Sequence, residues 1–283
     1  MTNNFSHCLN LIRAHDRDRY LASLFAPAQH RAALHALYAF NIEIERVRDA
    51  AREPMPGEIR LQWWREMLLG ERDGEAAAHP VASALKETIA RYQIETERLI
   101  ALIDVHTFDL YDEPFATLDD FDNYAALSEG IVLGTAAAIL GAEGVSVSTL
   151  VRHAAIAATV ARSLAALPRH ASRRQIYIPR VVMERHALIP ESIIARQVSG
   201  ALTSALAEMR RHARRQLQAA ALEAGDVPVT VSPALLPLAS VGPQLRRFER
   251  RGYEPFAPDV LSALRRQWLI WRASRDAKRI FAM

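Results

Sequence analysis

The sequence predicts an all-α protein, and its composition and spacing carry the prediction. Half of the 283 residues are apolar, and alanine and leucine dominate over the β-branched residues that favour strands. Apolar residues recur every three or four positions over long stretches, as on the buried face of a helix. No internal repeat or low-complexity linker divides the chain, so we expect one domain over residues 1–283.

The helices are delimited by residues that break the pattern. The first long helix is expected over residues 31–49, a stretch without glycine or proline, and Pro54 and Gly57 follow it. Residues 168–179 are expected to form a loop, because arginines and prolines interrupt the helical pattern there. The other helices are expected over residues 58–69, 80–93, 95–110, 118–140, 148–167, 191–223, 237–250 and 258–280.

Charge and cysteine content exclude several classes of function. The net charge of +3 comes from arginines scattered among nearly as many acids, so no nucleic-acid partner is expected. Cys8 is the single cysteine of the sequence, which excludes a disulfide framework and a thiolate zinc cluster. The start of the chain lacks the pattern of a signal peptide, and the longest apolar stretch, 131–140, is too short to span a bilayer. We expect a cytoplasmic protein.

One acidic pattern lies on the first long helix. Asn41, Glu45 and Asp49 are spaced four apart, which places them on one face of a continuous helix. Mg²⁺ is commonly held by one or two carboxylates together with substrate phosphate oxygens, so Glu45 and Asp49 are candidate metal ligands. The alternative is a solvated face, because Arg46 and Arg48 interleave with these acids and form weak ion pairs in such stretches.

The residues around this pattern resemble a known family. Leu37-Tyr38-Ala39-Phe40 precedes the acids, Trp64-Arg65 and His79-Pro80-Val81 follow, and Ile176-Tyr177-Ile178-Pro179 stands further on. The region from about 18 to 190 resembles squalene and phytoene synthases, in which the corresponding helix bears a DxxxD motif whose ends match Glu45 and Asp49. The segments around Phe40–Asp49 and Gly57–Trp64 look like a divergent branch, which includes respiratory complex I assembly factors of the NDUFAF type.

The resemblance also shows a departure from the family. Family enzymes carry a second acidic motif, DxxED, ahead of the tyrosine signature, and its first and last acids fall here on Ala166 and His170. Four arginines surround these positions, and guanidinium groups bind phosphate directly. The resemblance therefore implies diphosphate binding by Arg162, Arg169 and Arg173 with orientation by Tyr177, and Arg174 lies beside them. The alternative is that these arginines solvate a loop and pair with acids.

These observations lead to a functional prediction with two branches. We expect a helical bundle with a central, mostly apolar cavity, opened where Glu45, Asp49, Arg162 and Arg173 converge with Tyr177. With half of the metal ligands replaced, the expected protein is non-catalytic and binds an isoprenoid or a protein partner during assembly of a membrane complex. The alternative is an active transferase that condenses two prenyl diphosphates, with Glu45, Asp49 and Tyr177 as catalytic residues. Mg²⁺ is the expected cofactor of that alternative, and no cofactor is expected otherwise.

The C-terminal helix suggests a place for the protein in the cell. Trp268, Leu269, Ile270 and Trp271 stand beside three arginines, a combination found in helices that rest on anionic membranes. Such a helix would bring a cytoplasmic protein to the inner face of the membrane as a peripheral protein. The alternative is that these apolar residues pack onto the bundle.

Overall fold

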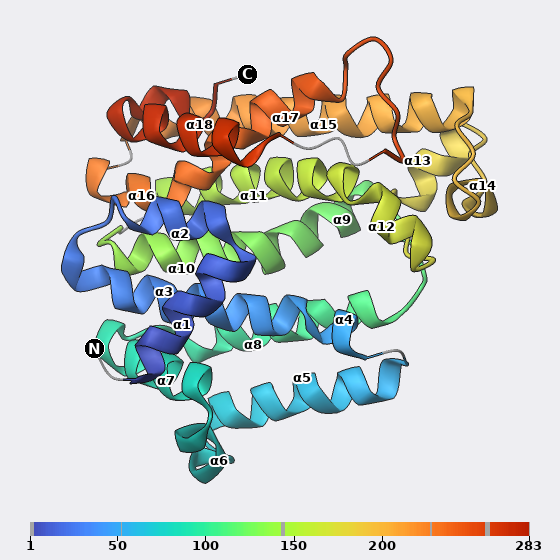
Figure 1. Cartoon of the computed structure of the whole chain (residues 1–283). Coiled ribbons are helices and arrows are strands. Elements are labelled where there is room, and N and C mark those ends of the chain that lie inside the picture. The colour runs from blue at the N-terminus through green and yellow to red at the C-terminus, as the bar shows by residue number, and fades with distance from the viewer. Residues whose placement is uncertain (1–2, 52, 143–144, 227, 258–260, 283) are drawn as a thin grey trace. The chain divides into compact units, whose positions relative to one another are not determined.

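The computed structural model describes residues 3–51, 53–142, 145–226, 228–257 and 261–282. All the regular elements in these ranges are helices, as the sequence predicts (Figure 1). The chain divides into two compact units. The first comprises Met1–Tyr111, Ile131–Gly144 and Pro228–Pro237, and the second comprises Asp112–Gly130, Val145–Val227 and Leu238–Met283. The expectation of a single domain over residues 1–283 stays a prediction.

The first unit is built around one buried helix, α3 (Ala28–Glu45). It packs against α1, α7 and α10, and its residues from 33 to 42 are all buried. A helix enclosed on several sides must be apolar around most of its circumference. This explains why most residues from Leu34 to Ile44 are apolar. The α-helices of this unit are α1 (Asn3–His15), α2 (Arg17–Ser23), α3, α4 (Val47–Ala50), α5 (Pro54–Leu69), α6 (Asp73–Ala78), α7 (Pro80–Tyr92), α8 (Thr96–Val105), α10 (Ile131–Ile139) and α16 (Ser232–Leu235).

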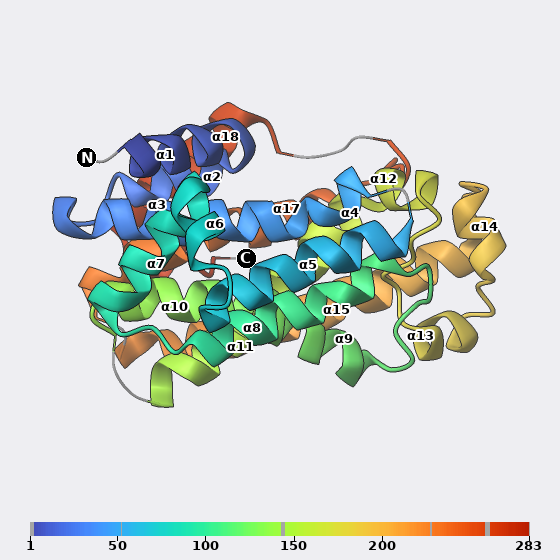
Figure 2. The ribbon, with the colours of Figure 1, turned by 90° about the horizontal axis from the view of Figure 1, so that it is seen from below.

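The second unit is organised by two long helices, α11 (Val145–Ala165) and α15 (Gly200–Glu223), which pack along each other in both views (Figures 1 and 2). Ser199 caps the start of α15 through its hydroxyl, which accepts from the Leu202 backbone N–H at 3.1 Å. The remaining helices of this unit are α9 (Leu118–Ala125), the π-helical η2 (Ala126–Gly130), α12 (Leu167–Ser172), α13 (Arg180–Arg185), α14 (Pro190–Ile194), α17 (Val241–Arg247) and α18 (Ala263–Arg275).

Short 3₁₀ turns connect or end these helices. They are η1 (His106–Leu110) and η4 (Val229–Val231) in the first unit, η3 (Ala224–Asp226) and η6 (Ala277–Arg279) in the second, and η5 (Leu236–Ser240), which runs from the first into the second.

The structure corrects several of the predicted elements. The helix expected over 191–223 is two helices, α14 and α15, because residues 195–199 are not helical. The helix expected over 31–49 begins at Ala28 and is divided at Arg46, whose ψ of −5° departs from the helical value without any glycine or proline. The segment 118–140 is three elements, with a π-helical turn between α9 and α10. The segment 168–179 is not all loop, because α12 begins at Leu167 with Pro168 in its first turn, where the missing N–H costs no helical hydrogen bond.

The C-terminal helix is shorter than expected, since α18 ends at Arg275 and the expected start, residues 258–260, lies outside the described residues. In the part of the chain that the structure describes, no helix combines the length and the apolar composition that a bilayer span requires.

Candidate functional site

The acids of the first motif lie in the first unit, at the break in the predicted helix. Glu45 is the last residue of α3 and Asp49 lies in the short helix α4, and both side chains are exposed. Asn41, one turn before Glu45, is buried instead. The three residues are thus divided between the interior of the unit and its surface.

The donor set does not suit a resident divalent metal. Across the described residues, no group of three or more His, Cys, Asp or Glu side chains lies close enough to hold a metal ion. Ala166 offers no ligand, and the imidazole of His170 is a poor ligand for the hard Mg²⁺ ion. That these two residues take the places of the second family motif stays a prediction. The role predicted for Glu45 and Asp49 as metal ligands stays a prediction.

Residues 162–177, which we call the second motif region, lie in the second unit. One of these residues, Arg162, forms an ion pair there. Arg162 on α11 places its Nη2 2.8 Å from Oε2 of Glu129 in η2. Glu129 is only 7% exposed, and the Arg162 side chain is 45% exposed. The geometry therefore gives the Arg162 guanidinium a carboxylate partner inside the protein, as one of the two readings of the sequence anticipated.

Sequence reasoning missed Glu129. π-Helical turns widen a helix locally and are frequent at functional sites, and this one carries Glu129 between Ser128 and Gly130. Gly130 lies against α11, since a Cβ at this position would be in ordinary van der Waals contact with Cβ of Ala155, at 3.5 Å. The signal in the sequence was a single acid, Glu129, directly before the longest apolar stretch of the chain.

His170 and Tyr177 stack on each other beyond this ion pair. Their ring centroids are 4.4 Å apart with the planes at 30°, and His170 is buried. Tyr177 also approaches Phe115 and Tyr124, each with a centroid separation of 6.1 Å. The residue in the place of a family carboxylate thus belongs to an aromatic cluster, in which a stacked ring pair contributes about 0.5–1.5 kcal/mol beyond burial.

The other arginines lie at the end of α12 and just beyond it. Arg169 and Arg174 are exposed, and Arg173 is half-buried. Arg174 has a positive φ of 60°, which is uncommon for a residue with a side chain and turns the chain sharply toward Tyr177. Because Glu45 and Asp49 belong to the first unit and Arg162, Arg169, Arg173 and Tyr177 to the second, the predicted convergence of these residues and the central cavity stay predictions.

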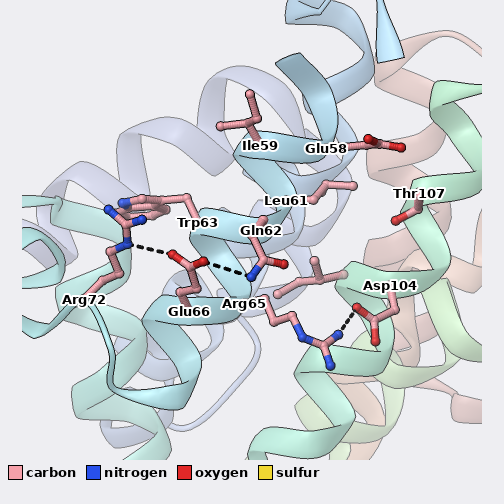
Figure 3. A pocket seen from close by; sticks show the side chains of 11 residues that line it. Glu58, Ile59, Leu61, Gln62, Trp63, Arg65, Glu66, Arg72, Asp104 and Thr107 are labelled. Atoms are coloured by element: carbon pink, nitrogen blue, oxygen red, sulfur yellow. Dashed lines mark hydrogen bonds and ion pairs between the residues drawn. The ribbon is translucent and has the colours of Figure 1, made fainter. Parts of the chain in front are cut away.

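Two pockets flank helix α5 in the first unit. One has a volume of about 610 Å³ and lies between α5 and α8, with Thr107 of η1 at its edge (Figure 3). The other, of about 510 Å³, is lined by residues of α3, α4 and α5 and by His79. Ile59 and Trp63 line both pockets, and Ile59 is 65% exposed. We call the outward row of Met55, Ile59 and Trp63 the α5 ridge.

The basic residues of the larger pocket are bound to acids. Arg72 donates to Glu66 at 2.7 Å, and Arg65 pairs with Asp104 (Figure 3). Arg72 also donates to Glu75 at 2.8 Å. These contacts raise the pKa of both guanidinium groups. With its arginines neutralised by neighbours, this pocket is a poor diphosphate site and a better match for an apolar partner surface with a polar rim.

Cys8, the single cysteine of the sequence, is buried and unreactive. Burial raises the pKa of its thiol to about 12, so the reactive thiolate is suppressed at neutral pH.

The chain is similar to proteins of two descriptions. A mouse protein named NADH dehydrogenase (ubiquinone) complex I, assembly factor 6 is 27% identical over 254 residues, which are 90% of this chain and 76% of the mouse protein. The squalene synthase HpnC from Alicyclobacillus acidocaldarius superposes with a TM-score of 0.71 at 22% identity, over 96% of this chain and 93% of HpnC. A dehydrosqualene synthase in complex with ligand gives a TM-score of 0.78 at 17% identity, over 97% and 96% of the two chains.

The two solved structures show that the fold is the all-α fold of squalene synthases. The family and the branch anticipated from the residues around Glu45 and Tyr177 are both confirmed. The family described as squalene/phytoene synthase matches residues 12–272, and the chain therefore belongs to the squalene/phytoene synthase family.

Proposed function

We propose that this chain is a non-catalytic member of its family that assists the assembly of a membrane complex of the NADH dehydrogenase type. The proposal rests on the contacts that the side chains of the second motif region make. There, Arg162 is bound to Glu129 and His170 is stacked on Tyr177. Both side chains make structural contacts within the second unit, where family enzymes are expected to hold metal.

Catalysis in the family depends on neutralising the charge of a leaving diphosphate, and Mg²⁺ ions supply that charge. Without carboxylates at positions 166 and 170, the second unit lacks the donors for this role. The relatives named as complex I assembly factors support a role in assembly rather than in chemistry.

A protein partner is supported by the α5 ridge. Ile59 and Met55 are 65% and 69% exposed, and Trp63 stands half-buried between the two pockets. Apolar and aromatic side chains beside pockets are common anchors of protein interfaces, surrounded by a polar rim such as Glu58, Arg65 and Glu66. We therefore assign the partner surface to this ridge.

The assembly role is tested by deleting the gene in its own host and measuring the assembled NADH dehydrogenase complex on native gels. The wild-type protein and Asp49→Ala should restore the complex, whereas Ile59→Arg and Met55→Arg should not. Leu222→Arg is the matched control, because Leu222 is 85% exposed on α15 in the second unit. Thermal melts of each purified variant establish that it is folded. If Ile59→Arg restores the complex fully, the α5 ridge is not the partner surface. If the deletion strain assembles the complex as the parent strain does, the protein has no role in assembly.

The second candidate function is the prenyl transferase, and the exposed Arg169 and Arg174 near Tyr177 favour it. In that case Glu45 and Asp49 would hold Mg²⁺, Arg162, Arg169 and Arg173 would bind diphosphate, and Tyr177 would orient it. The test is pyrophosphate release from farnesyl and geranylgeranyl diphosphate with Mg²⁺. Our proposal predicts none. Release that disappears in Asp49→Ala would establish the transferase instead.

Binding of an isoprenoid without turnover and a peripheral place at the inner face of the membrane are further parts of the proposal. A tritiated farnesyl diphosphate retained by the protein in equilibrium dialysis would support the first. The cytoplasmic location is tested by fractionation of the host, where the protein is expected in the cytosolic and membrane-peripheral fractions and is released from membranes by high salt.

A further inference from the structure

Helix α18 (Ala263–Arg275) is fixed to the second unit by one narrow side. Ile270 and Ala273 are buried, as is Leu261 just before the helix, whose backbone N–H donates to Oε1 of Gln244 at 2.9 Å. Ser262 caps the start of the helix by accepting from the Arg265 N–H at 3.3 Å. The helix is therefore held in place, and its opposite side is free to present other residues.

That opposite side is apolar and aromatic. Leu264, Trp268 and Trp271 are 79%, 48% and 49% exposed, and their spacing of four and three places them on one face of the helix. Exposed tryptophans in a contiguous stripe are unusual on a monomer surface and mark a place where something binds. We call this face the α18 stripe.

Positive charge surrounds the stripe. The helix carries Arg265, Arg266, Arg272 and Arg275 and no acid. The guanidinium of Arg272 lies 4.3 Å from the ring centroid of Trp268, and that of Arg275 lies 5.6 Å from that of Trp271. Each indole is thus paired with a cation, an arrangement suited to a surface that is apolar inside and anionic outside.

The basic character extends beyond the helix. Residues 238–283 contain ten Lys and Arg against four Asp and Glu, although the whole chain has a net charge of only +3. The pKa of the exposed Arg246 is lowered by desolvation and then by the neighbouring charges of Arg214 and Arg265. Glu249, which accepts from Nε of Arg214 at 2.9 Å, offsets part of this repulsion.

We propose that the α18 stripe rests on an anionic lipid surface, with Trp268 and Trp271 at the level of the headgroups and Arg265, Arg272 and Arg275 on lipid phosphates. The exposed Leu264 favours lipid over nucleic acid, because a phosphate backbone offers no apolar layer for it. The absence of acids from the helix favours an anionic bilayer over a partner protein, which typically presents both signs of charge. This inference deepens the proposed peripheral location and rests on it, but it needs no protein partner.

The test is flotation of the purified full chain with phosphatidylcholine vesicles that contain or lack phosphatidylglycerol. The wild-type protein should float with the anionic vesicles, and high salt should release it. Arg265→Gln, Arg272→Gln and Arg275→Gln should each weaken binding about fivefold. Trp268→Ala combined with Trp271→Ala should weaken it tenfold or more. The matched controls are Arg17→Gln and Leu222→Ala, which change exposed residues of the same types outside the stripe.

Tryptophan fluorescence distinguishes lipid contact from a purely structural role of Trp268 and Trp271, because only lipid contact makes their emission depend on vesicles. Anionic vesicles should shift the emission of the wild-type protein to the blue, and Trp268→Phe with Trp271→Phe should abolish the shift although Trp63 and Trp64 remain. Equal flotation with neutral vesicles, or flotation unaffected by the α18 variants, would overturn the proposal. So would α18 variants that keep lipid binding but fail to restore the NADH dehydrogenase complex, because the stripe would then be a protein surface. Loss of flotation alone, with the complex restored, leaves the assembly role intact.

Discussion

The two units differ in the exposure of the residues that resemble the family motifs. In the first unit, Glu45 and Asp49 match the ends of the family's first motif and are exposed. In the second unit, Arg162 and His170 stand near the second motif and are tied to the interior, through Glu129 at 2.8 Å and through the stack on Tyr177. The two acids are thus exposed, whereas Arg162 and His170 make contacts inside the second unit. If the second motif is lost as the resemblance implies, its positions have been given structural contacts in place of metal ligands.

The first unit also buries an imidazole whose pKa is lowered, and the largest of the predicted effects is the response of this group to acid. Burial, followed by the charge of Arg31, lowers the pKa of His35 from 6.5 to about 4, and its Nε2 lies 3.0 Å from the Ser23 hydroxyl. The unfolded imidazole takes up a proton below pH 6.5 but the folded one only near pH 4. The stability contributed by His35 is thus complete above pH 6.5, and about 3 kcal/mol is lost as the pH falls to 4.

Urea unfolding between pH 7 and pH 4 measures this loss. His35→Leu should flatten the pH dependence by that amount, and His15→Leu, at an exposed position of α1, should leave it as in the parent. If His35→Leu loses stability with acid as steeply as the parent, the imidazole is not the group that titrates.

In the second unit, removing one partner of the ion pair should have the next largest effect. Arg162→Leu leaves the Glu129 carboxylate, which is 7% exposed, without the guanidinium 2.8 Å away. Breaking a fully buried pair costs about 3–5 kcal/mol, and the half-exposed arginine reduces the expected loss to about 2 kcal/mol in the free energy of unfolding. Combining Arg162→Leu with Glu129→Leu should recover most of it, because neither charge of the pair then remains.

The comparison for this pair is Arg152→Leu, an exposed arginine on the same helix, which should change the free energy of unfolding by less than about 0.5 kcal/mol. Equal losses for Arg152→Leu and Arg162→Leu would mean that the ion pair contributes nothing specific to the second unit.

Local sequence patterns were sufficient for the helical class and for most helix positions. Pro80 starts α7 as expected, because proline in the first turn sacrifices no hydrogen bond, whereas Pro54, expected to break the chain before a helix at residue 58, is itself the first residue of α5. Pro168 led to a wrong prediction, because it lies in the first turn of α12 and the sequence predicted a loop there. The break at Arg46 has no local cause in the sequence, and the first two helices, α1 and α2, were not anticipated.

The candidate site was only partly predictable, because its decisive contacts join distant residues. The substitutions at Ala166 and His170 could be read from the sequence through the resemblance to the family. The partner of Arg162 could not, since Glu129 lies 33 positions earlier and depends on a π-helical turn to face α11. The α5 ridge was hidden for a similar reason: a helix with apolar residues on both faces gives no clear periodicity, so Ile59 and Trp63 did not stand out from Leu61 and Trp64.

The smallest effects on the free energy of unfolding are expected for Asp49→Ala and Glu45→Ala. The two changes sharpen the comparison because their effects should differ in sign. Asp49 lies in the first turn of α4, where the helix dipole favours a negative charge, so Asp49→Ala should cost up to about 0.5 kcal/mol. Glu45 ends α3, where the dipole opposes it, so Glu45→Ala should be neutral or slightly stabilising. Urea unfolding at pH 7 with the Arg162→Leu protein alongside measures both. A loss for either acid as large as that for Arg162→Leu would mean that the first motif, like the second region, is built into the fold, and the contrast between the two units would not hold.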